Sequence, residues 1–151
     1  MSHERVARAR SGITHDIEVR GHTFVSDEPG PVGGDDRGPT PQELIAGALA
    51  ACTAITLRMY GERKGWDLDG LEVVADSRPG ESGACGRFVV TLRLPDGLSD
   101  EQVRRLRVIA GKCPVHRTLA SPAVCAIEDR VELVGLSADR PLTRPQERES
   151  G

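Results

Sequence analysis

Cys113 stands at a position where a thiol ionises easily. Pro114 follows it, and proline favours the first position of a helix, so Cys113 is expected at the N-cap of a short helix. The positive end of the helix dipole stabilises a thiolate there, and His116 and Arg117 could add positive charge within one turn. The pattern predicts a redox-active or metal-binding cysteine, and a capping residue without reactivity is the alternative.

Cys52 lies inside a long apolar stretch, where a small buried side chain is the ordinary use of a free cysteine. The dipole gives little help in the middle of a helix, so a reactive Cys52 needs a cation from another segment. Arg58 lies about 120° around the helix and faces elsewhere. The candidates are Arg10 and Arg20, at the ends of the opening strands. Glu43 is about 180° around and roughly 13 Å along the helix, so it cannot meet Cys52 within one straight helix.

A metal site would be a competing use of these residues. Cys113 and His116 form one Cys-x-x-His pair, to which Cys52 and a carboxylate could be added. Structural zinc usually needs two close pairs, so we expect neither a metal ion nor another cofactor. The other two thiols are expected to be incidental, with Cys85 exposed in a glycine-rich loop and Cys125 buried in a strand.

One long helix and several short strands must position these side chains. Thr40 and Glu43 form a capping box and Gly65 suits the end of a helix, which predicts a helix over residues 41–64. Its first two thirds are apolar on nearly all sides, which is typical of a buried central helix. The other expected elements are strands at 5–10, 14–20, 22–26, 71–77, 87–94 and 124–134, a helix from Ser99 to near Gly111, and a short helix at 115–119. This order predicts an α+β fold.

Composition limits the class of protein. The length of 151 residues fits one domain, which is expected over 1–136, with a disordered tail at 137–151. The net charge of -3 argues against nucleic-acid binding. Only 3% of residues are aromatic, so a partner subunit is expected to complete a thin core. The longest apolar run, 44–57, is too short to span a bilayer, and no signal peptide is evident. We therefore expect a cytoplasmic protein with reduced thiols and no membrane partner.

Three motifs together resemble the OsmC/Ohr family, named for osmotically inducible protein C and organic hydroperoxide resistance protein. They are GGDDRGPTPQEL at 33–44, AACTA at 50–54 and CPVHRTL at 113–119. The resemblance extends in order over residues 14–133. The sequence CTAITLRMY from Cys52 onward is similar to an OsmC-like branch rather than to Ohr proper.

The resemblance implies an intertwined α+β homodimer, with antiparallel sheets around two long central helices. It implies that Cys52 is the peroxidatic thiol and that Cys113 resolves it. An arginine of the first hairpin, best matched by Arg10 and next by Arg20, would activate the thiolate, and Glu43 would hold that arginine across the dimer interface.

The sequence departs from the family pattern at two positions. The family's glutamate stands ten positions before the cysteine, where this chain has Gln42, which can orient an arginine by hydrogen bonding but carries no charge. His116 replaces the more usual serine of the second motif and could donate a proton or hold Cys113 as a thiolate.

The implied activity is a cysteine-based peroxidase that reduces organic hydroperoxides, and hydrogen peroxide less well, because apolar walls bind alkyl chains. A Cys52 sulfenic acid would condense with Cys113 to a disulfide, and an external thiol or dithiol would reduce it. The alternative is a small-molecule-binding or stress-response module on the same fold, without turnover.

Overall fold

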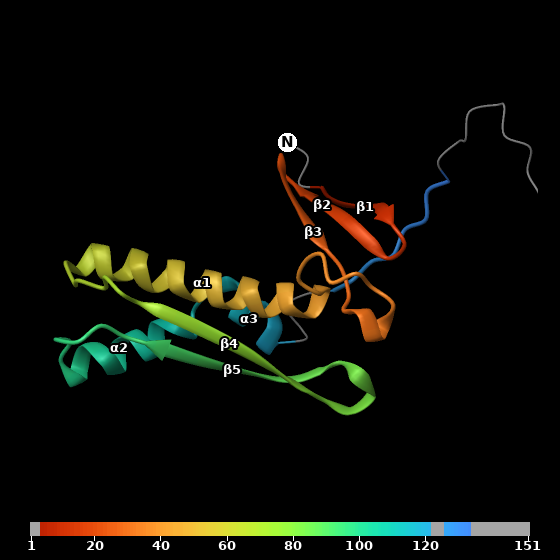
Figure 1. The fold of residues 1–151 in the computed structure, drawn as a ribbon. Coiled ribbons are helices and arrows are strands. Elements are labelled where there is room, and N and C mark those ends of the chain that lie inside the picture. Colours follow the sequence, from red (N-terminus) through yellow and green to blue (C-terminus); the bar gives the residue numbers. More distant parts are fainter. Residues whose placement is uncertain (1–3, 122–125, 134–151) are drawn as a thin grey trace, which may run out of the picture.

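The structure is a computed structural model that describes residues 4–121 and 126–133 (Figure 1). Strands and helices mix in the predicted order as far as the short helix at 114–120, and the α+β expectation is confirmed. The elements are β1 (Arg5–Ser11), β2 (Thr14–Val19), β3 (His22–Ser26), α1 (Pro41–Lys64), β4 (Glu72–Pro79), β5 (Cys85–Arg93), α2 (Asp100–Ala110) and α3 (Pro114–Ala120), with short 3-10 turns at Gly30–Val32 and Glu81–Gly83.

The first three strands form an antiparallel meander in the order β1-β2-β3. Arg20 and Gly21 both have positive φ, 49° and 81°, as a two-residue hairpin turn between β2 and β3 requires. This sheet packs only weakly against the rest of its own chain, and Figure 1 shows it standing apart, near the first turns of α1. A small sheet with so little cover needs apolar contact from elsewhere to be stable.

A buried carboxylate closes the loop that leads from the meander to α1. Asp27 accepts hydrogen bonds from the Thr14 hydroxyl at 3.0 Å and from the backbone N–H groups of Glu28, Asp35 and Arg37 at 2.8, 3.2 and 3.2 Å. Burial alone would raise the pKa of Asp27, but these hydrogen bonds to the ionised form outweigh it and lower the pKa. The charge therefore fixes the direction in which the chain enters the helix.

Helix α1 begins and ends where its capping residues predict. The Glu43 N–H donates to the Thr40 hydroxyl at 3.2 Å, and the Glu43 carboxylate accepts from the Thr40 N–H at 2.8 Å. Gly65 ends the helix at a φ of 68°, a conformation that glycine adopts without strain. The capping box occupies the Glu43 carboxylate at the helix start, far along the axis from Cys52.

The core lies between α1, α2 and one face of the β4–β5 hairpin. Its buried side chains are Leu57, Tyr60, Leu68, Leu106 and Ile109. The helix approaches the following turn so closely at Gly61 that a Cβ there would lie 2.6 Å from a methyl carbon of Leu68. This packing anchors the second half of α1, and with it the position of Cys52.

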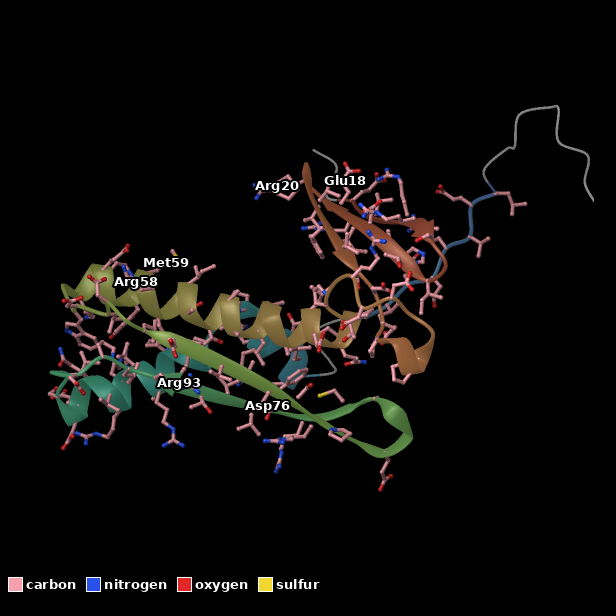
Figure 2. All side chains as sticks on the ribbon, in the orientation of Figure 1. Glu18, Arg20, Arg58, Met59, Asp76 and Arg93 are labelled. Atoms are coloured by element: carbon pink, nitrogen blue, oxygen red, sulfur yellow. The ribbon has the colours of Figure 1, made fainter. Side chains whose placement is uncertain are left out.

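The expectation that α1 is buried on nearly all sides is wrong for the single chain. Leu49, Thr53 and Leu57 are buried, but the opposite face carries Ile55 and Met59, each 59% exposed. Met59 points away from the β4–β5 hairpin, as Figure 2 shows. By length and composition alone α1 could also cross a bilayer, contrary to the estimate from its apolar run. Its packing against β4, α2 and α3 is instead that of a core helix with one uncovered side.

Two expectations concern the C-terminal part of the chain. The expected strand at 124–134 is not formed over the described residues 126–133, which have no regular secondary structure and expose Ile127, Val131 and Leu133. A strand needs a neighbouring strand to bond with, and none is supplied to this segment within the described part of the chain. Cys125 and the tail at 137–151 lie outside the described residues.

Candidate active site

The structure brings Cys52 and Cys113 together. Cys52 lies in the middle of α1, and Cys113 caps the N-terminus of α3, which packs against α1. Both are free thiols, and they lie close enough for each to shift the pKa of the other although the residues are 61 positions apart. The fold thus places the two thiols side by side, as a disulfide between them would require.

The two cysteines differ in their access to solvent. Cys113 is fully buried, whereas Cys52 is partly exposed. A molecule that approaches from outside therefore meets the Cys52 sulfur first. Cys113 lies behind it, where it can react with Cys52 but not readily with solvent.

The two thiols also differ in acidity. Burial raises the pKa of Cys52, and its hydrogen bond to Cys113 raises it further. Burial acts in the same direction on Cys113, but the hydrogen bond from Cys52, the backbone N–H groups of His116 and Val115, and Thr53 lower its pKa overall. In the single chain Cys113 is therefore the more acidic thiol of the pair, and Cys52 holds its proton more tightly.

The start of α3 explains part of this difference. Cys113 is the N-cap residue, as its sequence position predicts, with Pro114 at the first helical position. Its sulfur makes no regular capping bond, but the N–H groups of Val115 and His116 face it closely enough to lower its pKa. His116 thus acts on the thiolate through its backbone.

Thr53 is the site residue that sequence reasoning missed. Its side chain is buried, with 1% exposed, and its hydroxyl makes no regular hydrogen bond within the described part of the chain. The same hydroxyl lies near enough to the Cys113 sulfur to lower the pKa of that thiol. A buried hydroxyl without an oxygen or nitrogen partner is costly, and a thiolate is a good acceptor for it. The only sequence signal was a polar residue within an apolar stretch.

Two cavities lie near the pair, and His116, at the start of α3, lines both of them. One has a volume of about 450 Å³, includes Thr53, and is walled mainly by apolar side chains, with Arg107 at its edge. The other, of about 260 Å³, lies between α1, β5 and α3 and includes Cys85, which is half-buried rather than exposed in a loop as expected. Together they offer apolar space beside Thr53 and His116. The residues that wall them are Leu49, Phe88, Val90, Leu92, Leu94, Val103, Ala110 and Leu119.

The charged residues expected at the site are not brought to it within one chain. Arg10 forms an ion pair with Asp16 in its own sheet, with atoms 2.7 Å apart, and Arg20 lies at the far tip of the hairpin (Figure 2). Glu43 is engaged in the capping box, and Gln42 is exposed in the first turn of α1. The missing cation agrees with the raised pKa of Cys52.

The metal alternative finds no support in the part of the chain that the structure describes. Cys113 and His116 share the start of α3, and Cys52 is in contact with Cys113. No group of three or more His, Cys, Asp or Glu side chains within residues 4–121 and 126–133 is arranged to hold a metal ion. The arrangement is that of a dithiol.

Solved structures share the fold at low sequence identity. An OsmC-like protein from Mycoplasma pneumoniae matches with a TM-score of 0.70 and 15% identity, over 89% of this chain and 99% of that one. An organic hydroperoxide resistance protein from Elizabethkingia anophelis matches with a TM-score of 0.57 and 22% identity, over 81% and 91%. A protein from Legionella pneumophila, described as an organic hydroperoxide resistance protein OsmC, matches with a TM-score of 0.54 and 20% identity, over 77% and 88%. A search of curated proteins finds no match.

The sequence itself also matches a protein family. The model of the family described as OsmC-like protein aligns with residues 33–128, which is more than half of the chain. This range contains all three motifs on which the resemblance rests, and it includes both Cys52 and Cys113. The chain therefore belongs to the OsmC-like protein family.

Proposed function

We propose that this protein is a cysteine-based peroxidase that reduces organic hydroperoxides through Cys52 and Cys113. The observation that carries the proposal is the contact between the two reduced thiols, one partly exposed and one buried. Membership of the OsmC-like family and the names of two structural neighbours, which are organic hydroperoxide resistance proteins, support the same reaction class.

The first step oxidises Cys52. Cys113 ionises more readily than Cys52 because its pKa is lowered, and as a thiolate it takes the proton of the neighbouring Cys52 thiol. The Cys52 thiolate then attacks the outer oxygen of the hydroperoxide, and the O–O bond breaks. Cys52 becomes a sulfenic acid, and the departing alkoxide takes the proton from Cys113 to leave as an alcohol.

The second step forms the disulfide. Cys113, again a thiolate, attacks the sulfenic sulfur of Cys52, and the S–O bond breaks. The hydroxide that leaves takes a proton from solvent and becomes water. One hydroperoxide and two thiols thus give one alcohol, one water and one disulfide. Cys113 acts in turn as base, acid and nucleophile, which requires a group that exchanges its proton readily.

The differences in exposure and acidity between Cys52 and Cys113 also suit reduction of the disulfide. An external thiol or dithiol, as the cytoplasm would supply, reaches Cys52 first because it is the more exposed sulfur. Attack there expels Cys113 as a thiolate. A leaving thiol departs faster when its pKa is low, and the surroundings of Cys113 lower its pKa.

Apolar space beside the pair favours organic hydroperoxides over hydrogen peroxide. The two cavities that adjoin His116 have volumes of about 450 and 260 Å³ and are walled mainly by aliphatic side chains and Phe88. An alkyl chain placed there loses contact with water, whereas hydrogen peroxide has no such part.

We further propose that the working form is a homodimer. The uncovered face of α1 exposes Ile45, Ile55 and Met59, and the β1–β3 sheet lacks apolar cover within its own chain. A second copy packed on this face would bury both the apolar residues of α1 and the apolar side of the sheet. It would also allow Arg10 of one copy to approach Cys52 of the other and favour the thiolate there.

Hydroperoxide consumption by purified protein tests the proposal. With cumene hydroperoxide and dithiothreitol, Cys52→Ser is expected to abolish consumption, and Cys113→Ser to leave a Cys52 sulfenic acid or mixed disulfide. Cys85→Ser is the matched control for loss of a thiol: Cys85 lines the smaller cavity, so KM can change, but turnover is expected to persist. If the parent protein consumes no hydroperoxide, the chain is a binding module rather than an enzyme. If Cys52→Ser keeps full activity, the mechanism is wrong.

A further inference from the structure

A third cavity lies at the C-terminal end of α1, away from the cysteine pair. It has a volume of about 830 Å³ and opens between the last turn of α1 and the first half of α2. Lys64, which lines it, is twelve residues beyond Cys52, or roughly 18 Å along the helix axis. The cavity is lined by Tyr60, Lys64, Trp66, Ser99, Glu101, Gln102, Arg104, Arg105 and Val108.

The charge of this cavity is unbalanced. Lys64, Arg104 and Arg105 line it, against a single carboxylate, that of Glu101. The ion pairs found among the described residues all lie elsewhere, so these three cations have no carboxylate partner in that part of the chain. In a protein with a net charge of -3, such a concentration of unpaired positive charge creates a local potential that attracts anions.

Tyr60 contacts two of these cations, Lys64 and Arg105, and also the neighbouring Arg63. The Arg105 Nε donates a hydrogen bond of 2.9 Å to its hydroxyl, and Arg63, Lys64 and Arg105 each lie 5.8–5.9 Å from the centre of its ring. The bond from Arg105 lowers the pKa of Tyr60, with smaller contributions from the charges of Lys64 and Arg63. Tyr60 is itself buried and in edge contact with Trp66, so the arrangement rests on the core.

We propose that this cavity is a binding site for a small molecule that carries phosphate or clustered carboxylate groups. The planar guanidinium groups of Arg104 and Arg105 match the paired oxygens of either group, and Lys64 adds a point charge. The volume lies within the range of small-molecule sites, and the partly buried Trp66 offers an apolar surface to the rest of the ligand. The site does not involve the cysteines and does not depend on the proposed peroxidase activity.

The fluorescence of Trp66, the only tryptophan of the chain, reports directly on this cavity. The reduced full-length protein is titrated with inorganic pyrophosphate and, in a separate arm, with citrate. Sodium chloride at matched ionic strength is the control. Saturable quenching or enhancement by at least one of the two anions is expected, and the arm with the tighter binding identifies phosphate or carboxylate as the preferred group.

Variants locate the binding. Arg104→Gln keeps the bond between Arg105 and Tyr60 and is expected to weaken binding about tenfold, the effect of one charge-assisted hydrogen bond. Lys64→Gln is expected to weaken it as well. Arg93→Gln is the control and should bind the anions like the parent, because Arg93 is an exposed residue of β5 whose ion pair is with Glu72 of β4.

Three results would overturn the proposal. The first is no saturable change with either anion, and the second is an equal change with sodium chloride. The third is unchanged binding by both Arg104→Gln and Lys64→Gln, which would place the anion elsewhere.

Discussion

The Thr53 hydroxyl should destabilise the fold when Cys113 is a thiol and stabilise it when Cys113 is a thiolate. Replacing Thr53 by valine removes both effects. The side chain is 1% exposed, so solvent neither screens its interactions nor supplies a partner. When Cys113 is a thiol, the hydroxyl lacks a strong acceptor, and a buried unsatisfied polar group costs about 1–3 kcal/mol. When Cys113 is a thiolate, the hydroxyl can donate to it, and a hydrogen bond to a charged group contributes about 1.5–3 kcal/mol.

The variant should therefore change the acidity of the pair without damaging the fold. Loss of the hydroxyl removes one of the groups that lower the pKa of Cys113, so this pKa should rise and the thiolate should form at higher pH than in the parent. Because Thr53 helps to lower the pKa of Cys113 in the folded state, its contribution to stability is present at high pH and is lost as the pH falls through that pKa. At lower pH, Thr53→Val is expected to be at least as stable as the parent.

Ultraviolet absorbance of the thiolate, followed against pH, measures this effect, with Cys113→Ser as the baseline. Thermal unfolding on both sides of the transition measures stability. Thr118→Val is the matched control, because the Thr118 hydroxyl bonds to the carbonyl oxygen of Pro114 in α3 and not to sulfur. An unchanged thiolate titration in Thr53→Val, or an equal change in Thr118→Val, would refute the role of Thr53.

Three further substitutions test other parts of the account. Asp27→Asn should lower Tm at neutral pH. The difference in Tm from the parent should narrow only below pH 3.8, because the pKa of Asp27 is lowered in the fold and the stabilisation by its carboxylate is lost as the carboxylate is protonated. Arg10→Gln should reduce hydroperoxide consumption in the dimer at least tenfold while the fold, followed by circular dichroism, stays intact; full activity would exclude Arg10 as the activating cation. Met59→Lys should give monomers in analytical ultracentrifugation, whereas Val32→Lys, at an equally exposed position outside α1, should not; a dimer in both variants would place the interface elsewhere.

The local elements were predictable because their ends carry residues with specific backbone chemistry. The Thr40–Glu43 capping box and Gly65 fix both ends of α1, and the pair Ser99 and Gln102 does the same for the start of α2. These signals act within a few residues and need no tertiary information. The strand expected at 124–134 had no such local support, since a strand exists only where another strand pairs with it.

The contents of the site were only partly predictable. The capping position of Cys113 follows from Pro114, but its contact with Cys52 depends on how α3 packs on α1, which local patterns do not encode. The role of Thr53 could not have been predicted. Its position next to Cys52 in the sequence does not indicate that its hydroxyl lies near the Cys113 sulfur. In the proposed homodimer, the position of Arg10 relative to Cys52 would depend on a second chain, which neither the sequence nor one protomer defines.

Mass spectrometry of the reduced protein after one equivalent of cumene hydroperoxide tests the central claim most directly. The account predicts a peptide linked by a Cys52–Cys113 disulfide, formed together with one equivalent of cumyl alcohol. Oxidation at Cys85 or Cys125 with both site thiols still reduced, or no oxidation at all, would contradict it.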